Sequence, residues 1–320
     1  MTPAKFDVLV VGELNVDLIL SKIGAFPEIG KEILAKDMSL VLGSSSAILA
    51  SNLSSLGASV AFAGRIGKDM FGEVVLSSLK NKGVDTNGII RSDTAQTGAT
   101  IVMSYENDRA NVTYPGAMEE FCLADVNDNL LAQARHMHFS SYFLQPGIRK
   151  DVVKLFKKAK TMGLTTSLDP QWDPEEKWDI PLNELLPYVD FFMPNLSEVM
   201  AMTKQTDLIS SLGGLNYCKM VVKMGTKGSC LCEEETIRHF PVYLNDQVVD
   251  TVGAGDSFNA GFLFKYLQGA KEDECMNFGA LTGAVSTTAA GGTAAFTNLK
   301  DVLTIMKKKF GYYENHETAR

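Results

Sequence analysis

The chain has 320 residues, of which 45% are hydrophobic and 21% are charged, and its formal net charge is −8. These values fit a globular protein with a large core, and an acidic chain without a long basic run is not expected to bind nucleic acid. No apolar run reaches the roughly 18 residues that a membrane span needs, and the N-terminus does not resemble a signal peptide, so we predict a cytoplasmic protein that binds no membrane.

Compact apolar runs alternate with helix-like stretches along most of the chain. The first run, Phe6–Val11, suits a strand buried on both faces of a parallel sheet. The other strand-like runs are Val60–Gly64, His136–Ser140, Leu164–Leu168, Phe191–Met193 and Met220–Lys223. The predicted helices are Ser45–Leu56, Phe71–Lys82, Lys150–Met162, Leu196–Thr203 and Ser257–Gln268. This alternation predicts a mostly parallel sheet that is covered by helices on both faces.

Two segments break this rhythm. Residues 14–42 form short alternating strands, and residues 97–116 form a hairpin pattern with a polar turn. Alternation of apolar and polar residues is typical of sheets with one covered and one wet face. We therefore predict a small antiparallel sheet, a lid, over one edge of a main domain. The predicted main domain comprises residues 1–13, 43–96 and 117–310, and a polar tail follows at 311–320.

The five cysteines are scattered and odd in number, which favours free thiols in a reducing compartment. Cys230 and Cys232 lie on a predicted strand and are expected to point to opposite faces, which argues against joint metal binding. His136 and His138 lie in a strand-like run, where a structural role is favoured over metal ligation.

The stretch Asp250–Gly261 combines features that phosphoryl transfer to an alcohol requires. Gly253, Ala254 and Gly255 leave backbone N–H groups unshielded, and the helix-like segment that follows attracts anions at its N-terminus. A carboxylate at Asp256 would repel a phosphate bound there, so its presence needs a reason. The reason we favour is that Asp256 removes the proton from an attacking hydroxyl. The alternative is a helix start at which Asp256 is only a capping residue.

Two familiar nucleotide-binding signatures are absent from the sequence. Gly67-Lys68 lacks the first glycine of a P-loop and is followed by Asp69. A dinucleotide-binding turn would need a third glycine at Phe258. The phosphate site must therefore be built another way, which favours the glycine turn before Asp256.

The stretch Asp250–Gly261 resembles the second signature motif of the PfkB carbohydrate kinase family, which includes ribokinase and fructokinase. The resemblance runs from about Val8 to about Asp301. It implies a ribokinase-like three-layer α/β/α sandwich with a β lid, and a homodimer that pairs through the lid. It also implies ATP-dependent phosphorylation of a sugar hydroxyl, with Asp256 as the base and the Gly253–Gly255 amides as an anion hole for the γ-phosphate.

Three further motifs resemble cofactor-binding segments of this family. Asn195-Leu-Ser-Glu198 implies an Asn near the phosphates and a Glu that organises the waters of Mg²⁺, although the same residues also read as a helix capping box. Asp169 lies in a segment like the family Asp-Pro-Asn and is expected to assist Mg²⁺. The third motif implies ATP contacts, although it also reads as a hairpin turn, and its residues are Lys223, Gly225, Thr226 and Gly228.

The family is often activated by a monovalent cation held beside the anion hole. Asp250, Val252 and Ser286 occupy comparable places in this chain, as does the turn Ala289–Gly292. The resemblance therefore points to K⁺ as a further cofactor.

Asp17 resembles the family Asp that accepts hydrogen bonds from sugar hydroxyls, and it follows the first strand at the end where ligands gather in open α/β sheets. The family Gly-Gly pair, and the Asn that follows it, become Gly43-Ser44 and Ile48 here, and Asn52 is placed to compensate one helical turn later. The residues expected to contact the sugar are Asn15, Asp17, Gly43, Ser44, Asn52 and Arg109. Arg109 could equally be a solvated turn residue.

The departure at Ser44 and Ile48 leaves the acceptor open. A ribose- or fructose-like sugar is favoured. The alternatives are a nucleoside, 2-keto-3-deoxygluconate or a sugar phosphate, and the non-enzymatic alternative is a sugar-binding regulator that has lost activity.

Overall fold

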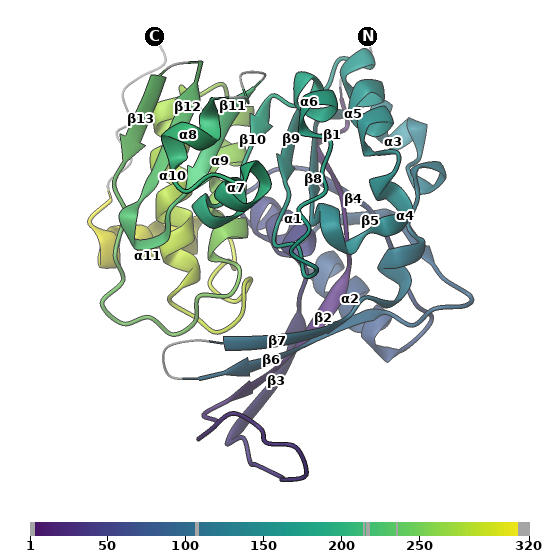
Figure 1. The fold of residues 1–320 in the computed structure, drawn as a ribbon, viewed down its shortest axis with the longest axis vertical. Coiled ribbons are helices and arrows are strands. Elements are labelled where there is room, and N and C mark those ends of the chain that lie inside the picture. The colour runs from purple at the N-terminus through teal and green to yellow at the C-terminus, as the bar shows by residue number, and fades with distance from the viewer. Residues whose placement is uncertain (1–3, 106–108, 214, 216–217, 235, 313–320) are drawn as a thin grey trace.

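The computed structural model describes residues 4–105, 109–213, 215, 218–234 and 236–312. Its main sheet has nine strands in the order β13-β12-β11-β10-β9-β8-β1-β4-β5 (Figure 1). All neighbours from β5 to β11 pair in parallel, and only β12 and β13 are antiparallel. These strands are β1 Phe6–Val11, β4 Val60–Ile66, β5 Asp85–Arg91, β8 Ala134–Ser140, β9 Thr165–Asp169, β10 Phe191–Phe192, β11 Lys219–Lys223, β12 Ser229–Glu233 and β13 Thr236–Phe240.

Helices cover both faces of this sheet. The α-helices are α1 Ser45–Ser55, α2 Met70–Asn81, α3 Asp128–Ala132, α4 Pro146–Arg149, α5 Val152–Thr161, α6 Leu182–Leu185, α7 Leu196–Thr203, α8 Leu208–Leu212, α9 Ala254–Leu267, α10 Glu272–Ser286 and α11 Leu299–Phe310. Short 3-10 helices are η1 Gly116–Glu120, η2 Leu123–Asp125, η3 Tyr142–Leu144, η4 Leu186–Tyr188 and η5 Gly225–Lys227.

The strand β1 shows why two layers of helices form. Val8 and Val10 pack with α1, α2, α9, α10 and α11 in one core, whereas Leu9 and Val11 pack with α5, α6 and α7 in another. Successive side chains of a strand point to opposite faces, so an uninterrupted apolar run needs cover on both sides. The predicted three-layer fold is confirmed.

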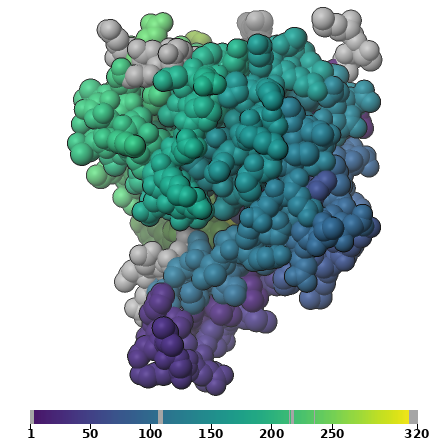
Figure 2. All heavy atoms as spheres, turned by 45° about the vertical axis from the view of Figure 1, so that its right-hand side comes forward, coloured from purple at the N-terminus to yellow at the C-terminus, as the bar shows by residue number. Residues whose placement is uncertain are grey.

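The second sheet is the lid, with strands β2 Asn15–Ser21, β3 Asp37–Leu42, β6 Gly98–Ser104 and β7 Arg109–Tyr114 in the order β3-β2-β6-β7. Each hairpin is antiparallel, but the two hairpins meet through the parallel pair β2–β6. The parallel pair arises because the first strand of each insertion leaves the main domain in the same direction (Figure 1). Figure 2 shows the first hairpin and its loop projecting from the body of the molecule.

The expectation about Cys230 and Cys232 is wrong. Their sulfur atoms lie 3.6 Å apart, and both side chains are buried. Residues two apart in a strand share a face, because side-chain direction alternates with a period of two. Within the described residues, no group of three or more His, Cys, Asp or Glu side chains is arranged to hold a metal.

The expected structural role of His136 and His138 agrees with their surroundings. Both rings are fully buried and contact Ser167 Oγ at 2.7 Å, and burial lowers the pKa of each to about 3. None of the helices in the described part of the chain is long and apolar enough to cross a membrane.

Candidate active site

The helix α9 begins at a glycine turn with no capping side chain. Gly253 is the N-cap residue and has φ 72°, a conformation that favours glycine. A Cβ atom at this position would lie 2.6 Å from Gly292 Cα, so a larger residue does not fit. No side chain occupies the first backbone N–H groups of α9, although the N–H of Ala254 lies 3.3 Å from Thr251 O, so this helix end is suited to bind an anion.

Asp256 lies in the first turn of α9, but it does not cap the helix. Its side chain is 8% exposed, and Gln171 Nε2 donates a hydrogen bond to Oδ1 at 3.1 Å. Burial, followed by the negative charge of Asp169, raises the pKa of Asp256 to about 7. The structure therefore disfavours the capping alternative and gives this carboxyl the basicity that a general base needs near neutral pH.

A buried ion pair stands beside this turn. Lys223 Nζ lies 2.5 Å from Asp169 Oδ2, which also accepts a hydrogen bond from Asn259 Nδ2 at 2.6 Å. Burial lowers the pKa of Lys223, but the charges of Asp169 and Glu198 outweigh burial and raise it overall. A Cβ atom on Gly255 would lie 3.7 Å from Lys223 Nζ, which places the ammonium group next to the proposed anion hole.

Glu198 and Asn195 form the predicted capping box at the start of α7. Asn195 Oδ1 accepts from the backbone N–H of Glu198 at 2.9 Å, and Glu198 Oε2 accepts from the N–H of Asn195 at 2.8 Å. Glu198 is 3% exposed, and burial, followed by the charge of Asp169, raises its pKa to about 7. The structural role does not exclude a role toward Mg²⁺, because a buried carboxylate near phosphates can hold metal-bound water.

The start of the lid contains a polar group around Asp17. A Cβ atom on Gly43 would lie 2.2 Å from Asp17 Oδ1 and 2.9 Å from Asn15 Oδ1, so these three residues are in close contact. Asn15 Nδ2 donates to Thr100 Oγ1 at 2.7 Å, whereas Asn15 Oδ1 is buried without a hydrogen-bond partner within the described structure. A buried acceptor without a partner is rare in proteins, which makes it a candidate for a ligand hydroxyl.

Ser44, Ile48 and Asn52 follow one another at intervals of one helical turn along α1. The Ser44 side chain caps this helix. Ile48 packs against Gly253 and Gly292, and the Asn52 Nδ2 group donates to Ser257 Oγ and to Gly292 O, at 2.9 Å each. Asn52 therefore joins α1 to α9 and to the turn at Gly292.

Arg109 begins β7, but its side chain lies outside the described residues.

The glycine turn after β11 is a hairpin turn, which is one of its two sequence interpretations. The strands β11 and β12 form a hairpin, and Gly225 and Gly228 both have positive φ. A Cβ on Gly228 would lie 2.2 Å from Phe240 O, which explains this glycine by packing alone. Gly225 and Thr226 are exposed in the turn that follows Lys223.

The residues predicted for a monovalent cation also come together. Asp250 accepts hydrogen bonds at 2.9 Å from the N–H groups of Val252 and Gly291, and Ser286 Oγ lies 3.5 Å from Val252 O. These contacts tie the segment before Gly253 to the end of α10.

Three side chains near Asp256 were missed as site residues. They are Gln171, which donates to Asp256 Oδ1 at 3.1 Å, and Glu13 and Ser45, of which the first raises and the second lowers the pKa of Asp256. An acidic residue directly after the apolar run Phe6–Val11 and Gly12 is the signal that could have found Glu13. Gln171 replaces the Asn of the family Asp-Pro-Asn segment, which should have marked it as a candidate.

Comparison with known proteins places this arrangement among sugar kinases. Residues 5–298 match the family model described as pfkB family carbohydrate kinase. The chain is 26% identical to ribokinase from Arabidopsis thaliana over 94% of this chain and 81% of the relative. It is 28% identical to fructokinase-2 from Solanum lycopersicum over 83% of this chain and 87% of the relative.

A solved structure shows the same fold. The structure of Arabidopsis thaliana ribokinase complexed with ribose and ATP superposes with a TM-score of 0.80 at 26% identity and covers 96% of this chain and 99% of that chain. The family match spans both sheets, the glycine turn and Asp256. The chain belongs to the PfkB family of carbohydrate kinases.

Proposed function

We propose that this kinase transfers the γ-phosphate of ATP to a hydroxyl of a ribose- or fructose-like sugar, with Asp256 as the general base. The observation that carries the proposal is the position of Asp256, a buried carboxyl of raised pKa at an uncapped helix N-terminus. Lys223 is the cation beside that helix end. The relative solved with ribose and ATP supports both substrates.

Asp256 accepts the proton as the sugar hydroxyl attacks the γ-phosphorus in line. The amides of residues 253–255 and the ammonium of Lys223 stabilise negative charge on the transferring group. Gln171 donates to Oδ1 of Asp256, and we assign the other oxygen, Oδ2, to the hydroxyl. A general base supplies about 10²–10⁴-fold, whereas orienting two substrates supplies about 7–11 kcal/mol, so the lid should contribute at least as much as the base.

The acidic residues of this site suit Mg²⁺ only if water and phosphate oxygens supply its direct ligands. The described residues contain no cluster able to bind a metal directly, and Asp169 Oδ2 is already engaged by Lys223 and Asn259. Glu198 and Asp169 would therefore hold metal-bound waters, as Mg²⁺ commonly allows. Mg²⁺, when bound, neutralises charge on the phosphates. Asn195, Gly225 and Thr226 remain our candidates for contacts with ATP.

The sugar would lie on the polar face of the lid. Asn15 Oδ1 and Asp17 accept its hydroxyls, Gly43 forms the floor beneath them, and Ser44 follows on the same turn. Arg109 stays a candidate without a described side chain. Both amide hydrogens of Asn52 are used within the protein, but its Oδ1 is buried without a hydrogen-bond partner in the described structure, so Asn52 stays a candidate acceptor for the sugar.

Gly43→Ala should raise the sugar KM by at least ~10-fold and leave the ATP KM within about twofold. The added Cβ would overlap Asp17 Oδ1 and Asn15 Oδ1, both of which we assign to the sugar. Steady-state kinetics in both substrates is the measurement. Gly24→Ala is the matched control, because an added Cβ there has no neighbour within 4 Å. An unchanged sugar KM in Gly43→Ala would remove this part of the lid from the sugar site.

A monovalent cation such as K⁺ is part of the proposal, because the loop that carries Asp250 and Val252 leads directly into Gly253. A cation bound by Val252 O and its neighbours would order the anion hole. Replacing K⁺ by tetramethylammonium at constant ionic strength should then lower kcat by about tenfold or more, as expected when one charge-stabilising group is misplaced. Equal rates in both salts would rule out this cation site.

The lid also supports the proposed homodimer. One of its faces is polar around Asp17, Thr100 and Thr113, and the other carries the cross-strand row Leu40–Leu18–Ile101–Val112. Val112 is 60% and Ile101 41% exposed. An apolar sheet face of this kind is stable in water only when another surface covers it. A second copy of the lid is self-complementary by two-fold symmetry.

Ile101→Lys should convert a dimer of 34.8 kDa chains into a monomer, because a buried charge would face the row of the partner. Analytical ultracentrifugation is the measurement. The control is Ile209→Lys, which places the same change on the 74% exposed Ile209 of α8. A wild-type monomer, or a dimer in Ile101→Lys, would contradict pairing through this face.

The single experiment that tests the function is ATP consumption across a panel of pentoses, hexoses, nucleosides, 2-keto-3-deoxygluconate and sugar phosphates. We expect a free sugar to give the highest kcat/KM. If a nucleoside or a sugar phosphate is the best acceptor, the proposed phosphoryl transfer stands but the proposed substrate is wrong. Sugar binding without ADP formation would favour the regulator.

A further inference from the structure

Glu13 is a buried carboxylate that the proposed transfer does not use. It follows β1, is 2% exposed, and accepts hydrogen bonds from two serines at the start of α1. Ser44 Oγ lies 3.0 Å from Oε1, the N–H of Ser46 lies 3.3 Å from Oε1, and Ser46 Oγ bonds Oε2. Ser46 Oγ also contacts Ser140 Oγ of β8 at 2.6 Å. Both carboxylate oxygens are thus engaged by the protein, so Glu13 does not offer an open site for a ligand.

The segment that Glu13 holds has an unfavourable backbone. Ser44 has φ 70°, a region that favours glycine, and the family pattern has glycine at this position. Ser44 Oγ shares its single hydrogen between the carbonyl of Glu13 at 2.7 Å and Glu13 Oε1 at 3.0 Å, and it accepts from the N–H of Ala47 at 2.9 Å. The hydrogen bonds of its own side chain therefore hold Ser44 in this conformation.

Residues before and after Ser44 contact both the proposed sugar site and the region around Asp256. Gly43 is in contact with Asp17 and Asn15 at the sugar site. Ile48, one turn further along α1, packs against Gly253, the N-cap residue of the helix that carries Asp256. Displacement of this turn would therefore move the sugar floor and a side chain that packs on the start of α9 together.

We propose that Glu13 is a positioning residue that clamps the turn Ser44-Ser45-Ser46 and thereby aligns the sugar with Asp256. This inference rests on the proposed function and extends it to a carboxylate that touches neither substrate.

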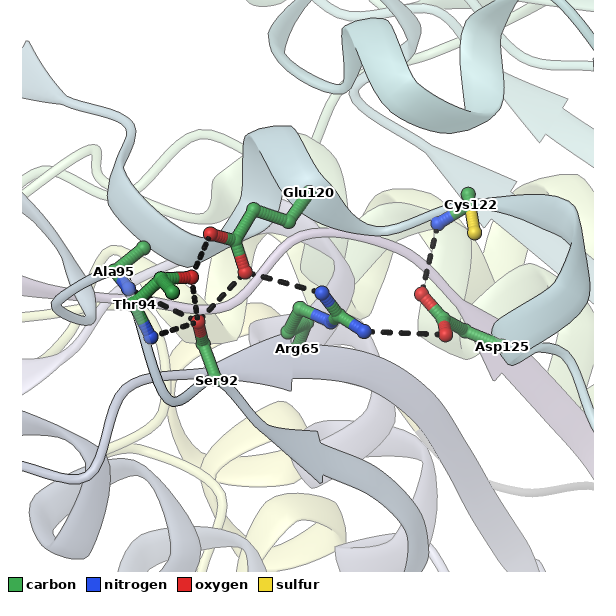
Figure 3. A network of polar contacts seen from close by, with 7 residues as sticks. All are labelled: Arg65, Ser92, Thr94, Ala95, Glu120, Cys122 and Asp125. Atoms are coloured by element: carbon green, nitrogen blue, oxygen red, sulfur yellow. Dashed lines mark hydrogen bonds and ion pairs between the residues drawn. The ribbon is translucent and has the colours of Figure 1, made fainter.

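The other lid hairpin offers a matched control at its own base. Glu120 accepts hydrogen bonds from Ser92 Oγ at 2.6 Å and Thr94 Oγ1 at 2.7 Å, and it pairs with Arg65 Nη1 at 3.0 Å (Figure 3). Glu120 thus also joins the segments that enter and leave a lid hairpin. Its polar partners are Ser92, Thr94 and Arg65, and they include neither Gly43 nor Asp256, so its loss should affect the fold without affecting the alignment.

The test compares Glu13→Gln with Glu120→Gln in the full-length protein, using the best acceptor from the panel. Glu13→Gln keeps the size of the side chain but removes the charge that accepts the serine hydrogen bonds. We expect its sugar KM to rise ~10-fold and its kcat to fall ~10-fold, because hydrogen bonds to a charged group are strong. The ATP KM should stay within about twofold, and Glu120→Gln should change no kinetic constant by more than about twofold.

A purely structural role for Glu13 would lower the active fraction, and hence kcat, without changing the sugar KM. An unchanged sugar KM in folded Glu13→Gln, or an equal change in Glu120→Gln, would overturn the proposal. Should Glu13→Gln fail to fold, Ser46→Ala removes one bond of the clamp and is expected to raise the sugar KM in the same assay; no rise would again overturn it.

A double-mutant cycle provides a second readout. If the two residues act through one clamp, Glu13→Gln and Ser46→Ala together should raise the sugar KM by much less than the product of the single effects. Fully multiplicative effects would contradict the clamp. Absence of transfer by the wild-type protein would contradict the proposed function itself, whereas active wild-type protein with normal Glu13→Gln kinetics would contradict only the role of Glu13.

Discussion

Asp256→Asn should lower kcat for sugar phosphorylation at least ~100-fold, because an amide cannot take the proton of the attacking hydroxyl. The change keeps the shape of the side chain and the glycine turn before it, so ATP binding should stay near normal. Steady-state kinetics and ATP titration by calorimetry are the measurements. The control is Asp301→Asn, which alters an Asp in the first turn of the exposed N-terminus of α11. Wild-type turnover in Asp256→Asn would remove Asp256 from the role of base.

The same variant should be more stable than the wild type in the absence of ligands at high pH. The folded pKa of Asp256 is raised from 3.8 to about 7, so this carboxyl contributes stability that is fully present below pH 3.8 and is lost as the pH rises through about 7. The ionised form therefore costs up to about 4 kcal/mol above neutral pH. Asn carries no charge and avoids this loss.

The difference in Tm between Asp256→Asn and the wild type should accordingly be larger at pH 8 than at pH 4. A difference that does not grow with pH would show that Asp256 is not held at a raised pKa. The activity should depend on pH in the opposite direction, because the base must be ionised to accept a proton.

Wild-type kcat/KM should fall as the pH drops below about 7. The residual activity of Asp256→Asn should not show this decrease.

Lys223→Met should lower the free energy of unfolding by about 3–5 kcal/mol, because it leaves the fully buried Asp169 without its cation. Glu198 and Asp256 also lose the opposite charge that lowers their pKa values. The kcat should fall about 10²–10³-fold, since Lys223 stands beside the anion hole. Denaturant unfolding and kinetics are the measurements.

Two further variants separate the catalytic and structural effects of Lys223. Lys160→Met breaks the half-exposed ion pair with Asp190 and should cost no more than about 1 kcal/mol, as surface pairs do. Lys223→Met combined with Asp169→Asn removes both buried charges and should recover most of the stability but none of the activity. Recovery of activity in the double variant would mean that Lys223 serves only the fold.

Much of the architecture follows from local patterns. Compact, mostly apolar runs such as Phe6–Val11 identified the strands that are buried on both faces, and the observed strand β1 has the same bounds. The edge strands β5 and β13 were not predicted, because Asp85–Arg91 and Thr236–Phe240 are half-exposed and lack an apolar run. The parallel pairing of β2 with β6 depends on how two distant insertions leave the main domain, which no local pattern records.

The sequence by itself determined the kinase class, since a glycine turn, a helix start and an acidic residue are adjacent in the chain and need no distant partner to be recognised. Only the tertiary structure decided the environment of Asp256. Gln171 lies 85 residues away along the chain, Asp169 is bound by Asn259 across 90 residues, and Glu13 lies just after the first strand. Basicity depends on burial and on neighbouring charges, and these are brought together by the sheet and not by sequence proximity.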